Sequence, residues 1–266
     1  MQILSDNIYM FQSGLWQLNS IHAHYIDTSI IWDPAYLPME LQKIANKVIN
    51  PIWPKRYLAF THGDYDHIAG SPYFESFVTI GSQEMQARQN KSTVLKQIEG
   101  IDQEFYIERI YPLNFPDLEI CPLITNSPTV LHFGSIECHI FHAGGHTSDG
   151  LFYVLPQLGL WIAGDYLSDI EFPFVEDSIE EYLKTLNQAK HILENYDIEF
   201  MVPGHGRIAC SKNEIYNRIE SSHGYLEGLI KETVPDWRES WGSSPFEIFL
   251  DKMHRQNIGY VRSKRI

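Results

Sequence analysis

The sequence lacks the features of a secreted or membrane-embedded protein. No apolar run approaches the roughly 18 to 20 residues of a membrane span, and the N-terminus has neither the basic nor the apolar region of a secretory signal. The three cysteines, Cys121, Cys138 and Cys210, form no CxxC pair, and an odd number is poor material for a disulfide framework. We therefore predict a cytoplasmic protein with reduced thiols and no membrane partner.

Positive charge is also scarce. The chain has 20 Lys and Arg residues against 34 Asp and Glu residues, which gives a formal net charge of −14. This charge repels phosphate backbones over the whole surface, so a nucleic-acid partner is not expected and a small molecule is the expected substrate. The sequence leaves the oligomeric state open.

The 266 residues, 44% of them hydrophobic, are enough to build a sizeable core. No repeat, low-complexity stretch or linker divides the chain, so we predict a single domain over residues 1–266. A helix is expected over 38–49, and Ser178 and Ser211 begin capping boxes of two later helices. Strand-like runs occupy positions 21–25, 29–32, 56–60, 135–141, 151–155, 160–163 and 199–202. This mixture indicates an α/β or α+β fold with its site on strand ends.

Four possible metal ligands are concentrated in one short loop. The run Thr-His-Gly-Asp-Tyr-Asp-His at positions 61–67 supplies His62, Asp64, Asp66 and His67 directly after an apolar stretch. Core packing does not explain imidazoles and carboxylates at this density, whereas a divalent cation does. A polar loop with chance histidines is the competing interpretation.

Three further candidates each follow a strand-like run. His146 lies in Gly-Gly-His-Thr-Ser, Asp165 in Ala-Gly-Asp and His205 in Pro-Gly-His-Gly. The neighbouring glycines allow sharp turns and close approach of the backbone. Together with the loop at 61–67, these residues offer four imidazoles and three carboxylates, a set that suits two borderline-to-hard divalent cations.

The pattern resembles the metallo-β-lactamase superfamily, whose signature is HxHxDH, then His in GHT, Asp after Gly, and His in GH. The resemblance covers roughly residues 15–210 and matches six of the seven ligand positions in type and order. It implies a four-layered αββα sandwich with a dinuclear metal site at one edge of two sheets. It also implies the ligand assignment, with His62, Asp64 and His146 on one metal, Asp66, His67 and His205 on the other, and Asp165 bridging.

Asp64 departs from the family pattern, because most members have histidine there. Two dications balanced by three aspartates and a bridging hydroxide form a neutral core, whereas the usual histidine leaves one positive charge. A less positive site acidifies its water less and prefers harder metals. Zinc is therefore the first expectation, with iron or manganese as the alternatives. A carboxylate here also resembles the iron-binding branches of the superfamily, in which HxExDH accompanies oxygen or nitric-oxide chemistry.

The resemblance and the ligand set together predict a metal-dependent hydrolase. A metal-bridging hydroxide is expected to attack the carbonyl of a small ester, lactone, thioester or amide, while Asp66 binds metal and receives the proton of the attacking water. A di-iron redox enzyme of the same fold is the second hypothesis. A non-catalytic metal-binding module is the third.

Several residues around the ligands have supporting roles in this prediction. Asp33 is expected to accept a hydrogen bond from a metal-bound histidine or from loop N–H groups, and Thr147 to hydrogen-bond loop backbone. Tyr65 either touches substrate or packs beneath its loop. Residues 82–130 are expected to roof the pocket, and 211–266 to form a C-terminal helical extension whose aromatic residues either line the pocket or pack the last helices.

Overall fold

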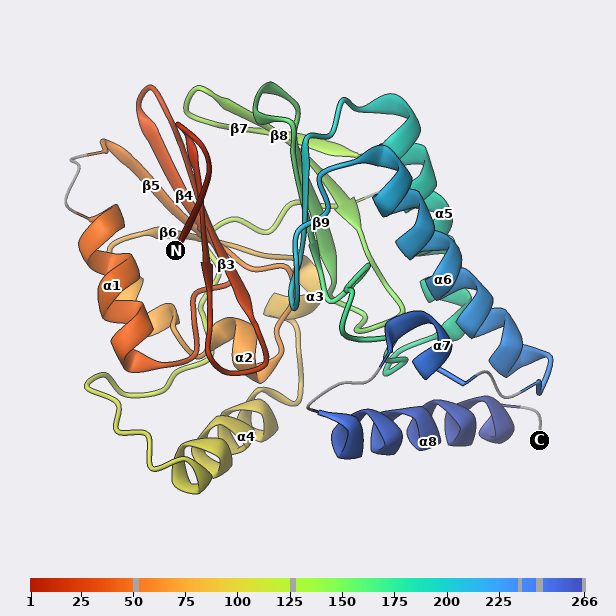
Figure 1. Ribbon diagram of the computed structural model, residues 1–266. Coiled ribbons are helices and arrows are strands. Elements are labelled where there is room, and N and C mark those ends of the chain that lie inside the picture. Colours follow the sequence, from red (N-terminus) through yellow and green to blue (C-terminus); the bar gives the residue numbers. More distant parts are fainter. Residues whose placement is uncertain (50–52, 125–127, 234–235, 243–245, 265–266) are drawn as a thin grey trace.

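The chain folds into two β-sheets that pack face to face between two layers of helices (Figure 1). The computed structural model describes residues 1–49, 53–124, 128–233, 236–242 and 246–264. This architecture confirms the α/β class and the four-layered αββα sandwich predicted from the sequence.

The first sheet is built from the N-terminal part of the chain. Strands β1 to β4 pair as an antiparallel meander, whereas β4, β5 and β6 run parallel to one another. The strands lie in chain order: β1 (Gln2–Ser5), β2 (Ile8–Gln12), β3 (Asn19–Tyr25), β4 (Thr28–Trp32), β5 (Lys55–Ala59) and β6 (Val78–Ile80).

The second sheet is built from the middle of the chain. Strands β7 to β10 are antiparallel neighbours, and β11 joins the edge parallel to β10. The strands are β7 (Thr129–Phe133), β8 (Ile136–His142), β9 (Leu151–Leu155), β10 (Leu160–Gly164) and β11 (Phe200–Pro203).

Helices cover the outer face of each sheet. In Figure 1, α1 lies outside the first sheet, α5 and α6 lie outside the second, and α8 runs below α6 and α7. No helix in the described part of the chain is long and apolar enough to cross a membrane. The helices are α1 (Pro38–Val48), α2 (Tyr65–Ile68), α3 (Gln83–Gln86), α4 (Lys91–Glu104), α5 (Ile179–Asn195), α6 (Lys212–Ile230), α7 (Arg238–Trp241) and α8 (Glu247–Ser263), with 3₁₀ turns at Ser71–Phe74 and Pro156–Leu158.

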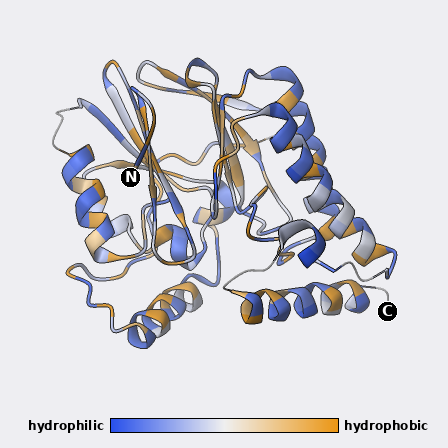
Figure 2. Cartoon of the chain, viewed as in Figure 1, coloured by the Kyte–Doolittle hydropathy of each residue, from blue (hydrophilic) through white to orange (hydrophobic). Residues whose placement is uncertain are grey.

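Alternation along the strands creates the three interfaces between the four layers. On β4, Ile30 and Trp32 face the second sheet while Ile31 faces the α1 layer. On β10, Ile162 faces the first sheet while Trp161 faces the α5 layer. Successive side chains point to opposite faces of a strand, so a sheet buried on both sides needs apolar residues throughout. The helices are instead amphipathic, with hydrophilic and hydrophobic residues interspersed along each (Figure 2).

Most sequence predictions of elements are confirmed within one or two residues, including the 21–32 hairpin and the 38–49 helix. The capping boxes form only in part. Ser178 and Ser211 each accept the N–H of the third residue, as expected. In a complete capping box, Glu181 and Glu214 would accept the backbone N–H of the two serines. They instead form ion pairs with Lys184 and Arg218, which compete for the carboxylates.

The strand ends that carry the candidate ligands meet at one edge of the sandwich. Strands β4 and β5 are parallel, so Asp33 and the 61–67 loop leave the first sheet side by side. Strands β10 and β11 are also parallel, which brings Asp165 and His205 together at the end of the second sheet. The carboxyl ends of parallel strands are a common position for functional sites, because parallel strands present them at the same edge.

Candidate metal centre

Asp165 lies between two pairs of histidines, and each of its carboxylate oxygens faces one pair. Its Oδ2 lies 3.7 Å from Nε2 of His62 and 3.5 Å from Nε2 of His146. Its Oδ1 lies 3.0 Å from Nε2 of His67 and 3.5 Å from Nε2 of His205. One carboxylate thus connects two halves of a single cluster.

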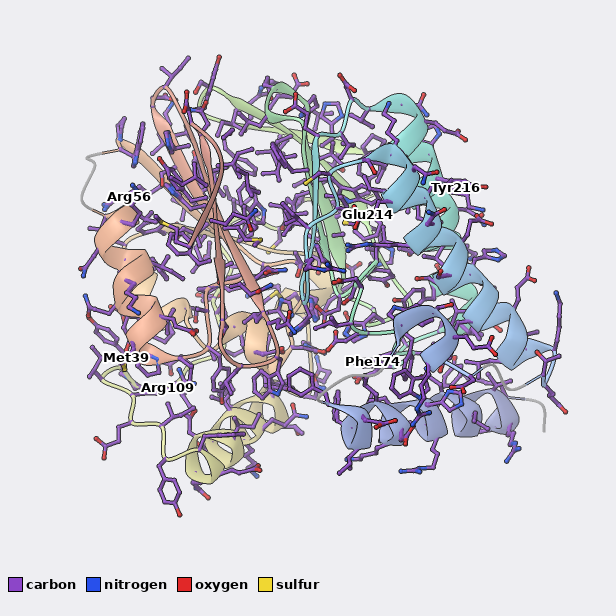
Figure 3. All side chains as sticks on the ribbon, viewed as in Figure 1. Met39, Arg56, Arg109, Phe174, Glu214 and Tyr216 are labelled. Carbon is purple, nitrogen blue, oxygen red and sulfur yellow. The ribbon has the colours of Figure 1, made fainter. Side chains whose placement is uncertain are left out.

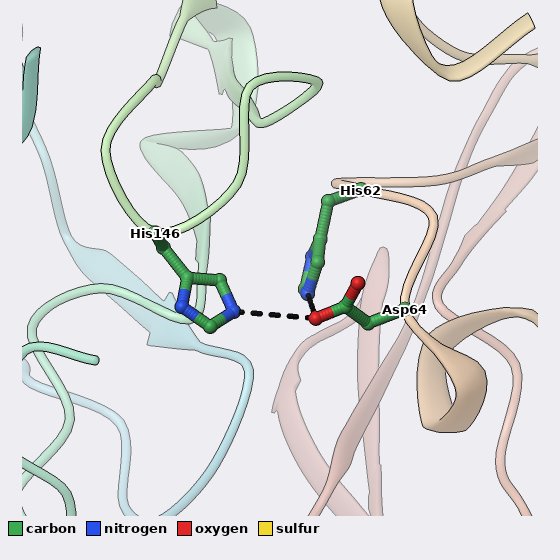
Figure 4. Close-up of side chains that lie close together, drawn as sticks. All are labelled: His62, Asp64 and His146. Atoms are coloured by element: carbon green, nitrogen blue, oxygen red, sulfur yellow. Dashed lines mark ion pairs between the residues drawn. The ribbon is translucent and has the colours of Figure 1, made fainter. Parts of the chain in front are cut away.

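Asp64 completes the first half of the cluster. Its Oδ2 lies 3.6 Å from Nε2 of His62 and 3.5 Å from Nε2 of His146, and Figure 4 shows both imidazoles directed at this one oxygen. The three ligand atoms lie within 4.8 Å of one another, as a single ion would require.

Asp66 completes the second half. Its Oδ2 lies 3.2 Å from Nε2 of His205 and 3.9 Å from Nε2 of His67. These three ligand atoms also fall within 4.8 Å of one another. The structure therefore brings together all seven residues that the sequence singled out, in the two groups that the resemblance implies.

The donor atoms fit divalent cations because two of them are buried without a hydrogen-bond partner. Nε2 of His62 and Nε2 of His146 have no such partner among the described residues, and the facing carboxylate oxygens lie 3.5 to 3.7 Å away. Buried polar atoms are rarely left in this state unless something else satisfies them. Imidazole nitrogens and carboxylate oxygens that converge from separate strand ends are a ligand set for zinc, iron or manganese.

The opposite ring nitrogens are held by neighbouring groups, which orients the imidazoles. Nδ1 of His146 lies 3.0 Å from the carbonyl oxygen of Phe174, and Nδ1 of His205 lies 2.9 Å from that of Trp16. A carbonyl accepts only from a protonated nitrogen, so when either ring is neutral its Nε2 carries the lone pair that a cation needs.

Asp33 fixes the start of the ligand loop. Its Oδ1 accepts the N–H of Thr61 at 2.8 Å and its Oδ2 accepts the Thr61 hydroxyl at 2.7 Å. The same Oδ2 lies 3.0 Å from Nδ1 of His67. Asp33 has a φ of 47°, a left-handed conformation that is uncommon for residues other than glycine. The carboxylate therefore links loop backbone and ring orientation at a strained position.

The carboxylates hold His146 and His205 in their charged form in the metal-free state. Burial opposes protonation of His146, but Asp64 and Asp165 raise its pKa to about 10. Burial likewise opposes protonation of His205, but Glu171, Asp165 and Asp66 raise its pKa to about 10. Protons thus supply the positive charge that the carboxylates need, and metal ions would compete with them.

The hydrogen bond expected from Thr147 is absent among the described residues, because its buried hydroxyl has no partner. Other side chains hold this loop. The Tyr166 hydroxyl accepts the N–H of His146 at 2.9 Å and lies 2.7 Å from the carbonyl oxygen of Gly144. Thr185 donates to the same carbonyl at 2.7 Å. These two residues already satisfy the backbone that Thr147 was expected to bind.

Arg88 is a site residue that the sequence did not reveal. Its Nη2 donates to Oδ1 of Asp64 at 2.8 Å, and its Nη1 lies 3.5 Å from Oδ2 of the buried Asp149. The guanidinium holds one oxygen of Asp64 and leaves the other directed at His62 and His146. Arg88 follows α3, 24 residues after Asp64, and no local spacing signal links positions so far apart.

Two glycines allow the charged side chains of the cluster to pack close to the backbone. A Cβ on Gly63 would lie 2.7 Å from Nη1 of Arg88 and 2.9 Å from Oδ2 of Asp149. A Cβ on Gly204 would collide with Oδ1 of Asp165. Any larger residue at either position would displace a charged group of the site.

A cavity of about 260 Å³ opens onto the cluster. Tyr65 lines this cavity and makes an edge-on ring contact with Trp16, so its contact with substrate stays a prediction. The described residues that line it are Trp16, Asp64, Tyr65, Asp66, Gln97, His146, Asp165, Glu171, Phe174, Glu176, His205, Phe249, Met253 and Gln256.

The C-terminal aromatic residues divide between the two roles considered for them. Phe249 of α8 lines the cavity, whereas Trp237 is buried and donates to Asp251. Trp241 donates its ring N–H to the carbonyl oxygen of Ser168. Figure 3 shows Phe174 just above α8, and this ring makes an edge-on contact with Phe249.

Comparisons with known proteins agree with this architecture. A family model described as "Metallo-beta-lactamase superfamily" matches residues 26–205. No curated protein matches the chain significantly.

Solved structures share the fold at low sequence identity. TTHA1429, a metallo-beta-lactamase family protein from Thermus thermophilus, is 15% identical with a TM-score of 0.63 over 87% of this chain and 83% of that one. BLEG-1, a B3 metallo-beta-lactamase, is 15% identical with a TM-score of 0.55, and the match covers 76% of this chain and 93% of BLEG-1. The DIM-1 metallo-beta-lactamase is 16% identical with a TM-score of 0.54, and the match covers 83% of this chain and 96% of DIM-1. The family model covers more than half of the chain, and the chain therefore belongs to the metallo-beta-lactamase superfamily.

Proposed function

We propose that the protein is a dinuclear metal-dependent hydrolase that cleaves a small ester, lactone, thioester or amide. The observation that carries the proposal is the position of Asp165, whose two oxygens each face a different pair of buried histidines. A structural site for one ion needs no such bridge between two ligand groups.

Each half of the cluster would hold one ion. His62, Asp64 and His146 would bind the first and Asp66, His67 and His205 the second, with one Asp165 oxygen completing each set. Two divalent ions would supply an acidified water and a polarised substrate carbonyl.

The proton of the attacking water requires an acceptor at the cavity surface, and we assign this role to Asp66. Its side chain lines the cavity, and its Oδ2 lies 3.2 Å from Nε2 of His205. Its ion pairs with His67 and His205 both use Oδ2, so the other carboxylate oxygen is the atom available to receive a proton. Asp33 would act as a positioning residue through Thr61 and His67.

Metal identity depends on Asp64. A carboxylate lowers the positive charge of the site relative to histidine, which favours harder ions such as iron or manganese over zinc. Arg88 adds a positive charge beside Asp64, but Asp149 balances it on the other side of the guanidinium. Zinc remains the first assignment, with iron and manganese as alternatives.

A di-iron redox enzyme is the second candidate function, and the carboxylate at position 64 is the observation that favours it. A non-catalytic metal-binding module is the third, and the cavity that opens onto the cluster argues against it.

We also propose that α4 and α8 form the roof of the substrate cavity. Gln97 comes from α4, within the 82–130 segment, and Phe249, Met253 and Gln256 come from α8 at the C-terminal end. The sandwich supplies the ligands, and these two helices would supply the walls that contact substrate.

Metal analysis combined with a substrate panel tests the proposed function. The protein, purified without added metal, would be assayed with lactones, thioesters, phosphoesters and β-lactams. We expect two divalent ions per chain and hydrolysis of a carboxylic ester, lactone or thioester. Two irons without hydrolysis would favour the redox function, and no bound metal after loading would refute both.

A further inference from the structure

The walls of the cavity carry more negative charge than the candidate ligands alone account for. Glu171 and Glu176 line the cavity together with the three aspartates of the cluster. Both glutamates come from the segment between β10 and α5, and neither side chain forms an ion pair or hydrogen bond within the described residues. They are therefore available to a ligand.

The two glutamates flank opposite halves of the cluster. Glu171 interacts electrostatically with His205, Asp165 and Asp66 and, less strongly, with His146, so most of its ligand neighbours belong to the second half. Glu176 interacts with His146, Asp64 and His62, which places it by the first. Its backbone N–H donates to the carbonyl oxygen of His146 at 3.1 Å, so its position is fixed to the ligand loop. Two carboxylates thus stand on either side of any substrate that reaches the cluster.

No described residue that lines the cavity is a lysine or an arginine. The nearby Arg88 forms ion pairs with Asp64 and Asp149 and interacts more weakly with Glu176. Two dications would not fully offset the three aspartates and two glutamates, and a hydroxide would add further negative charge. Burial raises the pKa of Glu171 to about 7 and also raises the pKa of Glu176. Two bound dications would lower both pKa values and favour the charged carboxylates. The cavity therefore repels carboxylate and phosphate groups on a substrate.

Among the described residues, four aromatic rings line the cavity together with Gln97, Met253 and Gln256. Trp16 and Tyr65 meet edge-on at 5.6 Å between ring centroids, and Phe174 and Phe249 meet at 5.8 Å. Aromatic faces attract cations through their quadrupole, and carboxylates attract them through charge. The two groups together are the environment in which proteins bind ammonium ions.

We propose that the substrate carries a protonated amine or quaternary ammonium group beside its hydrolysable carbonyl, and that Glu171 and Glu176 select it. This inference rests on the proposed hydrolase function. The glutamates act as specificity-determining residues and the aromatic rings as the apolar lining around the cation.

Three matched esters test the charge preference. The p-nitrophenyl esters of 6-aminohexanoic acid, hexanoic acid and adipic acid share a six-carbon chain and end in an ammonium, a methyl group and a carboxylate. For the metal-loaded enzyme we expect kcat/KM for the ammonium ester to exceed that for the neutral ester about tenfold, with the carboxylate ester lowest. Equal values, or a preference for the carboxylate ester, would overturn the inference and leave the proposed function intact.

Substitutions locate the preference. The ratio of kcat/KM between ammonium and neutral esters should fall about threefold or more in Glu171→Gln and in Glu176→Gln, and approach one in the double variant. A ratio within one enzyme cancels any loss of bound metal. Glu99→Gln removes the same charge from the exposed side of α4 and should keep the wild-type ratio. An unchanged ratio in the double variant would refute the role of the glutamates.

A binding measurement keeps the inference testable if none of the esters turns over, an outcome that would count against the proposed function. Calorimetric titration of the metal-loaded protein with 6-aminohexanamide and hexanamide compares the same two groups without chemistry. Tighter binding of the amine, lost in the Glu171→Gln/Glu176→Gln double variant, supports the inference. Equal or weaker binding of the amine overturns it.

Discussion

Metal binding by this cluster should release protons, and the number follows from the histidine environments. The pKa values of His146 and His205 are raised to about 10 in the metal-free state, so both imidazoles carry a proton at neutral pH. The pKa of His67 is also raised, because Asp165, Asp33 and Asp66 outweigh the effect of burial. A metal binds only the neutral ring, so each of these histidines must lose its proton.

The expected magnitude is at least two protons per chain at pH 7.5. Each released proton makes the overall metal-binding constant rise about tenfold per pH unit, so two protons give about a hundredfold rise per unit between roughly pH 6.5 and 9. The sign is fixed by the direction of the pKa shifts. A raised pKa keeps the proton on the ring to higher pH, and metal binding therefore strengthens as the pH increases.

Calorimetric titration with zinc in buffers that differ in protonation enthalpy measures the proton count directly. The slope of observed enthalpy against buffer enthalpy gives the number of protons released. His191→Ala, which removes an exposed histidine of α5, should leave that slope unchanged. A slope below one proton, or an affinity that does not vary with pH, would refute the electrostatic account of the cluster.

The remaining predictions concern variants and stability. Asp66→Ala should abolish hydrolysis with little loss of stability, and unchanged turnover would refute its assignment. Asp64→His should raise zinc content and lower iron and manganese content in metal analysis of the purified protein, and identical contents would remove the charge argument. Arg88→Ala and Asp64→Asn should each lower the free energy of unfolding of the metal-free protein. The double variant should lose about 1–3 kcal/mol less than the sum of the two single losses, because the two side chains share one ion pair. Strict additivity would show that the pair does not contribute. The melting temperature of the metal-free protein should fall as the pH rises from about 6.5 towards 10. The protonated rings of His146 and His205 stabilise the fold through the neighbouring carboxylates, and this stabilisation is lost when the rings lose their protons. The melting temperature of the metal-loaded protein should not show this fall.

The sequence predicted the positions of the candidate ligands because they follow strands with strong local signals. Strands β10 and β11 are short apolar runs that end in Gly164 and Pro203, and β5 leads into an apolar Leu-Ala-Phe stretch at 58–60. The first ligand follows each strand within three residues. Parallel pairing of β4 with β5 and of β10 with β11 then brings distant ligands to one edge. The order of strands and loops along the chain was therefore enough to predict that the candidate ligands lie at strand ends.

Features set by tertiary contacts were not predictable in the same way. Strands β1, β2, β6 and β7 were missed, since edge and short strands depend on pairing more than on their own pattern. Within the 82–130 segment, the chain forms two helices separated at 87–90. This break places Arg88 beside Asp64, and only the folded chain reveals the pair.

Arg109 illustrates why a charged residue alone is no signal of a site. It forms a two-point ion pair with Asp102 and donates to the carbonyl oxygen of Tyr36. Figure 3 shows it beside α1 and α4, away from Phe174, and it is not among the described residues that line the cavity. Arg88 and Arg109 look alike in the sequence, and their different surroundings appear only in the structure.

Counting the bound ions tests the central claim most directly. Native mass spectrometry of the zinc-loaded protein should show two ions per chain, because Asp165 joins two complete ligand groups. The same measurement on His205→Ala should show one ion, since only the second group loses a ligand. A single ion in the wild-type protein at saturating zinc, or two ions in His205→Ala, would contradict the dinuclear centre.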